Sequence, residues 1–365
     1  MHDLDSYHIH DGDDWTPKSF SKKPLVKCQT PKSIPTYDYP AAIKAAEQQG
    51  EIFWLPTEPK VEKDLHCIKT ELTAPALHGV MTTLKLFTLY EMVAGDEYWG
   101  GRFKRTFPRP DFKRMAATFS NVELNVHMPF YQRVDELLGL NTDEFYSSFT
   151  EDAVLKARMD FLGEVISSKD DLASVGIFSM VEGSILYSSF AFLMSFQANG
   201  NNQIPNIHAG LTFSVKDENL HSEGGAFAFR TLLKEKKEAG LSEVEEIRTK
   251  AKIYTAAEQI FEHESKIIGM IFEKGEIKGI NANDLCVFVQ HRINVVLEQL
   301  ALPPLYEIGD NPISEWFYKM IGGDVQHDFF AKLGSSYNRN WSKSGFVWTV
   351  GGLQGREWSE INEPI

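Results

Sequence analysis

The chain has 365 residues, of which 42% are apolar and 24% charged, a balance typical of a globular protein with one large domain or two average ones. Fifty-one acidic against 37 basic residues give a formal net charge of −14, which repels a phosphate backbone, and no local basic patch offsets it. Three scattered cysteines exclude a disulfide framework and a thiolate metal site. The composition therefore predicts a cytoplasmic protein with no nucleic-acid partner.

Residues 1–40 are expected to form an extended N-terminal arm. They are polar, contain five prolines, and lack the basic-then-apolar pattern of a secretory signal. The most apolar later stretch, 172–197, carries Glu182 in its interior, and its uncharged remainder of about fifteen residues is short of the ~20 that span a bilayer. We therefore expect a buried helix there and no membrane partner.

Helical periodicity dominates the rest of the chain, and strand-like alternation is weak. Ser242 and Glu245 form a capping box before one long helix, Gly275 and Gly279 follow it, and Pro303-Pro304 ends the next. Long helices with short connections predict an all-α bundle, one domain over residues 41–334. Apolar residues recur at spacings of three and four in Leu84–Val93, Met115–Leu138, Val154–Ile166, Leu172–Phe196, Ile204–Leu233, Val244–Phe272 and Leu285–Leu302.

The last segment, residues 335–365, has a different composition. Glycines alternate with tryptophans and a phenylalanine without a helical period, so the segment has no core of its own. Exposed aromatic side chains of this kind anchor in the pockets of protein partners. We expect a flexible tail that docks on a partner.

Four glutamates lie inside strongly apolar helical segments, where a solvated charge is not expected. Glu218 and His221 are three residues apart and share a helical face, while Glu123 and His127 are four apart. Glu182 is the only formal charge between Asp171 and Lys216. Glu91 follows a similar apolar stretch, although acidic neighbours leave a surface position open for it.

Several buried carboxylates need a counter-charge, because burying one unpaired carboxylate costs several kcal/mol. Two metal ions supply it: a ferritin-like di-metal site takes a Glu from each of two helices and a Glu/His pair from each of two others. Oxygen donors with one imidazole per metal suit iron or manganese. The predicted ligands are Glu91, Glu123, His127, Glu182, Glu218 and His221.

With these motifs in place, the chain resembles the small, radical-generating subunit of class I ribonucleotide reductase over roughly residues 53–337. The resemblance rests on Phe53-Trp54-Leu55-Pro56, Glu91, Glu123 with His127 and Tyr131, Glu182, Asp217-Glu218-Asn219-Leu220-His221, Asn311-Pro312-Ile313 and Tyr337. The run from His127 to Tyr131 is more similar to phage-encoded members than to the best-studied cellular ones. A phage-encoded protein of this family is expected in the cytoplasm of the host.

The resemblance implies a di-iron centre that uses dioxygen to oxidise Tyr131 to a stable radical. It further implies radical transfer from the centre through His127, Asp217 and Trp54 to Tyr337, and docking of the tail on the large subunit, which reduces ribonucleotides to deoxyribonucleotides. A homodimer is also implied.

Two departures from the family pattern bear on these expectations. Glu and His are usually three apart in the second ligand helix; here they are four apart, and Pro129 predicts a kinked or widened turn that absorbs the extra residue. The first ligand is Glu91, as in the subgroup with a manganese/iron cofactor and no radical tyrosine. Because Tyr131 is retained, we favour di-iron with a tyrosyl radical and keep manganese/iron open.

Two other functions are compatible with parts of the pattern. A ferritin-like oxidase or oxygenase shares the ligands but needs its own substrate pocket and no long-range electron route. Iron-storage proteins of this fold are usually much shorter than this chain. A helical scaffold protein needs no buried carboxylates. Tyr337 and the aromatic tail favour the reductase subunit.

Overall fold

The computed structural model describes residues 25–331 and shows an all-helical bundle, confirming the predicted fold class. Within that range the only extended pairing is an isolated bridge between Ile277 and Ile280. The α-helices are α1 Pro40–Glu51, α2 Leu65–Thr70, α3 Ala74–Met92, α4 Lys104–Thr106, α5 Pro110–Val122, α6 Met128–Leu138, α7 Asp143–Ser147, α8 Ala153–Ser167, α9 Asp171–Ser184, α10 Tyr187–Met194, α11 Pro205–Glu238, α12 Glu243–Ile271, α13 Ala282–Gln299 and α14 Pro312–Ala331. Short 3-10 turns occur at Lys27–Gln29, Val61–Asp64, Ser148–Glu151 and Ala198–Gly200, and two π-helical segments, η4 Val93–Phe103 and η5 Glu123–His127, continue α3 and α5.

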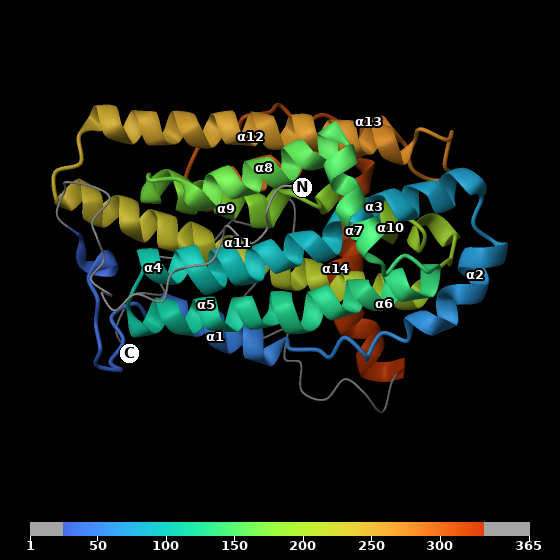
Figure 1. The fold of residues 1–365 in the computed structure, drawn as a ribbon, viewed down its shortest axis with the longest axis horizontal. Coiled ribbons are helices and arrows are strands. Elements are labelled where there is room, and N and C mark those ends of the chain that lie inside the picture. Colours follow the sequence, from blue (N-terminus) through green and yellow to red (C-terminus); the bar gives the residue numbers. More distant parts are fainter. Residues whose placement is uncertain (1–24, 332–365) are drawn as a thin grey trace.

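The long helices run nearly parallel to the long axis of the molecule (Figure 1). Helix α9 is packed against α11, α12 and α13, and α3 packs against α6. Helix α1 lies against α5 at the edge of the bundle (Figure 1). Side chains from all these helices fill one continuous core, so the bundle has a single interior.

All seven predicted segments are helical, but two of them are not continuous α-helices. The segment predicted over 115–138 contains the π-helical η5. The segment predicted over 172–196 breaks at Leu186, whose left-handed φ of 68° separates α9 from α10. The capping box of Ser242 and Glu245 at the start of α12 is present, as predicted. The prediction did not include α1, the short helices α2, α4 and α7, or α14. Helix α1 buries only alanine and glutamine side chains, which give a weak apolar stripe.

The apolar stretch Asp171–Met194 is long and apolar enough to cross a membrane, but 94% of its most apolar window is buried inside the protein. A buried core helix passes the same test of length and composition. The prediction of a buried helix here is therefore confirmed.

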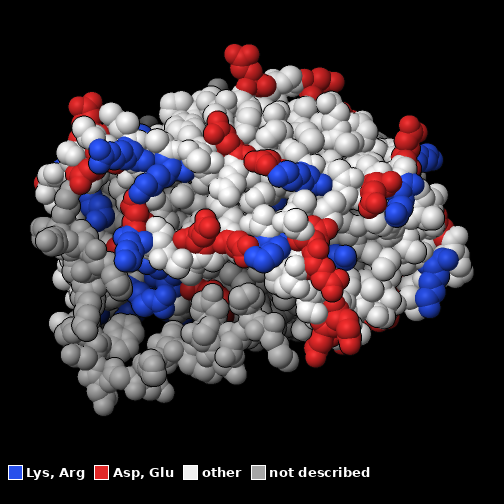
Figure 2. All heavy atoms as spheres, turned by 45° about the horizontal axis from the view of Figure 1, so that its top comes forward, with Lys and Arg blue, Asp and Glu red and all other residues white. Residues whose placement is uncertain are grey.

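Acidic and basic side chains are interspersed on the face that includes α12 (Figure 2). Ion pairs of Lys250 and Lys237 with Glu246, and of Lys266 with Glu262, account for part of this pattern. The surface of this face thus has no extended basic patch of the kind that binds nucleic acid.

Candidate metal centre

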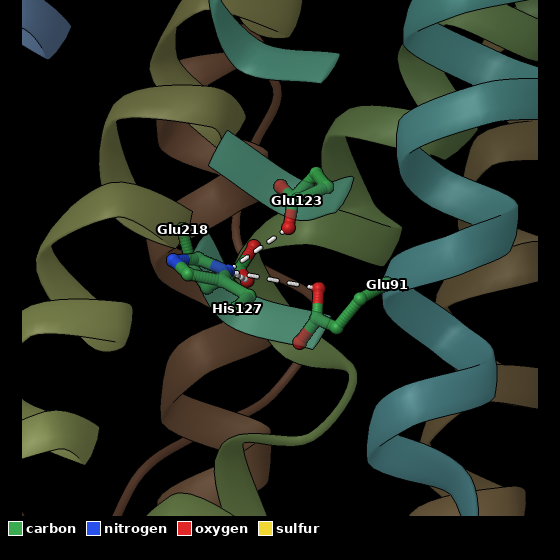
Figure 3. A group of neighbouring side chains, drawn as sticks. All are labelled: Glu91, Glu123, His127 and Glu218. Atoms are coloured by element: carbon green, nitrogen blue, oxygen red, sulfur yellow. Dashed lines mark ion pairs between the residues drawn. The ribbon is translucent and has the colours of Figure 1, made fainter. Parts of the chain in front are cut away.

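Four helical rods bring the six predicted ligands together in the middle of the bundle. Glu91 comes from α3, Glu123 and His127 from η5, Glu182 from α9, and Glu218 with His221 from α11; all six side chains are buried. Figure 3 shows Glu91, Glu123 and Glu218 converging on the imidazole of His127. The surface position considered for Glu91 is wrong, because its side chain is fully buried.

The ligand atoms form two overlapping groups. In each group, one nitrogen or oxygen per residue lies within 4.8 Å of every other: Glu91, Glu123, His127 and Glu218 form the first, and Glu123, Glu182, Glu218 and His221 the second. Each group could hold one metal ion, with one imidazole apiece. Glu123 and Glu218 belong to both groups, so each of these two carboxylates could serve either ion.

The unusual spacing of Glu123 and His127 is explained by the π-helix η5. The amide of Met128 donates to the carbonyl of Glu123, five residues back, so the turn contains an extra residue. With this wider turn His127 Nδ1 lies 2.9 Å from a Glu123 carboxylate oxygen. The predicted widened turn is therefore present, immediately before Pro129.

Both imidazoles present Nδ1 to the centre and use Nε2 for an outer partner. His127 Nε2 lies 2.9 Å from Asp217 Oδ2, and His221 Nε2 lies 3.0 Å from Gln49 Oε1. Gln49 also donates to Asp217 Oδ1 at 2.7 Å, so one amide connects the two histidines. Such outer partners fix the tautomer and orientation of a metal-binding histidine.

The chemistry of the donor atoms fits two metal cations. Burial raises the pKa of Glu91 and of Glu182 well above its usual range, and the neighbouring carboxylates of Glu123 and Glu218, respectively, raise it further. Apart from ion-pair contacts with one another, such as those of both histidines with Glu123, several inward-facing atoms of the ligands have no hydrogen-bond partner in the described chain. They are both carboxylate oxygens of Glu91, Glu123 and Glu218, one of Glu182, and Nδ1 of both histidines. Bound cations would satisfy these inward-facing atoms, as the sequence argument required.

Tyr131 lies at the edge of the centre, in α6, one turn after His127. Its ring is 1% exposed and stacks on Phe87 at a centroid distance of 4.5 Å, and Phe87 in turn contacts Phe190. Burial raises the pKa of Tyr131 well above its usual range, and the Glu91 carboxylate raises it further. Phe130, the competing residue, instead packs against Trp54.

A hydrogen-bonded chain leads out of the centre. Asp217 Oδ2 accepts from Trp54 Nε1 at 2.8 Å and also contacts His127 Nε2, which joins the three residues as the resemblance implied. Trp54 is 1% exposed, whereas its neighbours Phe53 and Leu55 are 41% and 51% exposed. The hydrogen-bonded chain of side chains therefore ends just beneath the protein surface. Tyr337 and the tail lie outside the described residues.

Sequence reasoning missed two residues of the site. Trp99 in η4 donates from Nε1 to Glu182 Oε1 at 2.8 Å, and Gln49 in α1 bridges Asp217 and His221. Trp99 falls eight residues after Glu91, two helical turns along, which is a usable signal. Gln49 offered no such signal in the sequence, because it lies in α1, a helix that was not predicted.

The bundle and its paired carboxylate and imidazole groups define the ferritin-like di-metal class of proteins. The family model for the ribonucleotide reductase small chain matches residues 33–312, and the chain belongs to that family. It is thus a small subunit of ribonucleoside-diphosphate reductase, as the resemblance indicated.

Individual relatives agree with this assignment. A probable ribonucleoside-diphosphate reductase small subunit of Invertebrate iridescent virus 3 is 22% identical over 338 residues, covering 86% of each chain. The ribonucleoside-diphosphate reductase subunit beta of Chlamydia pneumoniae is 24% identical over 301 residues, covering 78% of this chain and 83% of that one.

Solved structures share the fold. A putative class I ribonucleotide reductase from Bacillus halodurans has a TM-score of 0.68 at 22% identity, covering 77% of this chain and all of that one. The dimanganese(II)-NrdF of Streptococcus sanguinis also has a TM-score of 0.68, at 19% identity, covering 78% and 98%.

Proposed function

We propose that this small subunit generates a stable radical on Tyr131 at a di-iron centre and delivers it to the large subunit through Trp54. The observation that carries the proposal is the pair of overlapping ligand groups, which lies near a buried tyrosine and contains His127, the first member of the hydrogen-bonded chain to Asp217 and Trp54. When bound, the metal ions would supply the reduction of dioxygen and thereby the oxidising equivalent. A manganese/iron pair fits the same oxygen-rich donors and stays open.

The residues around the centre have separable tasks. Glu123 and Glu218 would hold both ions, while Glu91 with His127 and Glu182 with His221 would each complete one side. Phe87 and Phe190 exclude water from Tyr131, which protects an oxidised phenol from reduction by solvent-borne species. Asp217 holds the imidazole of His127 and the indole of Trp54 at hydrogen-bond distance, which orients both for electron transfer.

The first experiment tests the radical. Reconstitution with Fe(II) in air should load about two metal ions per chain, as the class of site requires, and give a tyrosyl signal in electron paramagnetic resonance that disappears in Tyr131→Phe. A signal unchanged in Tyr131→Phe would overturn the assignment of the radical. Reconstitution with manganese, or with both metals, identifies the active pair from the same measurement.

A second measurement tests the ligand set. Glu182→Ala should reduce metal content to about half of the normal loading, because Glu182 serves one of the two ions and its loss leaves that site with fewer donors. Unchanged metal content would remove Glu182 from the centre. Substrate oxidation by the isolated chain, with no requirement for a large subunit, would instead support a ferritin-like oxidase.

Three features of the assembly belong to the same proposal. The tail 335–365 is proposed to dock on the large subunit, with Tyr337 passing the radical across. The small subunit is proposed to act as a homodimer in the cytoplasm. The family supports partnership with a large subunit.

A further inference from the structure

Four tyrosines, Tyr90, Tyr98, Tyr131 and Tyr187, are fully buried and have hydroxyl groups without a hydrogen-bond partner of normal geometry in the described chain. An oxidant formed at the metal centre therefore has more than one phenol within the same core. Tyr131 and Tyr187 have different charged groups around them. This difference bears on where the radical stays.

Tyr187 is connected to Tyr131 by a row of aromatic rings. Its ring centroid lies 5.6 Å from that of Phe190, Phe190 lies 5.3 Å from Phe87, and Phe87 stacks on Tyr131 at 4.5 Å. Tyr187 follows the ligand Glu182 by five residues, just after the break at Leu186. Tyr187 is thus a second phenol in contact with the packing that encloses Tyr131.

Arg292 lies directly over the ring of Tyr187, with its guanidinium carbon 4.0 Å from the ring centroid. Arg292 is 2% exposed, and the hydrogen bonds described for its guanidinium go to a carbonyl, an amide and a hydroxyl oxygen. A buried guanidinium is costly to desolvate, so its N–H groups need acceptors within the protein.

Hydrogen bonds hold the guanidinium in this position. Arg292 donates to the carbonyl of Gly183 from Nε at 3.1 Å and from Nη2 at 3.0 Å, to Asn219 Oδ1 at 2.8 Å, and to the Tyr318 hydroxyl at 3.0 Å. Gly183 and Asn219 directly follow the ligands Glu182 and Glu218. The positive charge is therefore fixed with respect to both the metal centre and Tyr187.

We propose that Arg292 is a positioning residue that keeps Tyr187 reduced and so confines the radical to Tyr131. The proposal rests on the proposed radical function. In the proposed oxidation of Tyr131 its O–H bond would break: bound metal ions, once oxidised by dioxygen, would take up the electron, and the Glu91 carboxylate, the charged group that acts most on this phenol, would accept the proton. Arg292 acts by making the competing oxidation of Tyr187 unfavourable.

The electrostatic reason follows from the two surroundings. Tyr187 Oη has no acceptor for its proton in the described chain, so removing an electron leaves a positive charge on the ring, next to the guanidinium. Two unit charges about 4 Å apart in a protein interior repel strongly enough to change the ratio of the two oxidised species on the order of a hundred-fold or more. The charged group that acts most on Tyr131 is instead the Glu91 carboxylate, whose negative charge would stabilise the positive charge left on the ring by loss of an electron.

The test compares charge-keeping and charge-removing variants in iron-reconstituted full-length protein by electron paramagnetic resonance. Arg292→Lys should keep the single Tyr131 signal. Arg292→Met, which is close in size but neutral, should give a second tyrosyl signal with different hyperfine splitting and a lower yield at Tyr131. That second signal should disappear in Arg292→Met/Tyr187→Phe.

A folded Arg292→Met protein with normal metal content and only an unchanged Tyr131 signal would overturn the proposal. If that variant does not fold, Tyr131→Phe with Arg292 intact decides: no radical at Tyr187 is expected. A signal in Tyr131→Phe that disappears in Tyr131→Phe/Tyr187→Phe refutes the role of Arg292 while leaving radical generation in place. Absence of any tyrosyl signal in the unaltered protein refutes the proposed function and the role of Arg292 with it.

Discussion

Gln49 is the residue whose side chain unites the two halves of the centre. Its amide nitrogen donates to Asp217 and its amide oxygen contacts His221 Nε2, which requires that nitrogen to carry the proton and leaves Nδ1 free to bind a metal. The ligands themselves could be predicted from the sequence, because a carboxylate inside an apolar helix needs a counter-charge. Gln49 could not, since a neutral amide in a weakly patterned helix carries no such requirement.

We predict that Gln49→Leu lowers metal affinity by about 10- to 100-fold, the usual loss when an outer partner of a metal-binding histidine is removed. Titration of the metal-free protein with Mn(II) or Fe(II) under anaerobic conditions measures the change. Gln259→Leu, in the half-buried part of α12, is the matched control and should bind metal normally. Equal affinities for the two variants would contradict the role given to Gln49.

At the scale of elements, the two π-helical segments pack against each other and fix the position of Glu123. A side chain at Gly95 of η4 would place its Cβ 2.8 Å from the Cβ of Glu123 and 2.8 Å from Leu124 Cγ in η5. The helices could be predicted from apolar periodicity, which sets their faces over many turns. The π-turns could not be located in the same way, because one extra residue per turn changes the apolar pattern little. The exception is η5, for which the four-residue spacing of Glu123 and His127 and the following Pro129 gave a local signal.

We predict that Gly95→Ala displaces Glu123, lowers metal content and destabilises the protein by about 1–3 kcal/mol, the usual cost of overpacking. Gly163→Ala in the exposed part of α8 is the matched control, because its Cβ meets nothing within 4 Å. That control should be neutral or gain about 0.5–1 kcal/mol from the better helix former. Thermal unfolding and metal analysis of both proteins measure the difference; equal loading in Gly95→Ala and the control would show that η4 does not constrain the ligand.

For the whole molecule, the residues proposed for radical generation and for the first step of its delivery belong to one bundle. The metal centre, Tyr131 and the hydrogen-bonded chain to Trp54 all lie within the described residues, whereas the tail 335–365, proposed to contact the large subunit, is outside them. The bundle could be predicted because its core follows from helical periodicity. The partner and the homodimer followed only from the resemblance and from the aromatic tail, because exposed side chains at an interface have no periodicity that a sequence pattern can identify.

We predict that deletion of residues 338–365 leaves the metal content and the Tyr131 signal unchanged, because the six proposed ligands and Phe87, which stacks on Tyr131, all lie within the described residues. Binding to the large subunit should fall at least about tenfold, as expected when aromatic anchors are removed from an interface. Tyr337→Phe in the full chain is the control: it should bind normally and keep the radical but fail to support nucleotide reduction, since a phenylalanine cannot carry the radical onward. Loss of the radical on deletion would mean that the tail belongs to the fold, and normal reduction by Tyr337→Phe would mean that the radical leaves Trp54 by another residue.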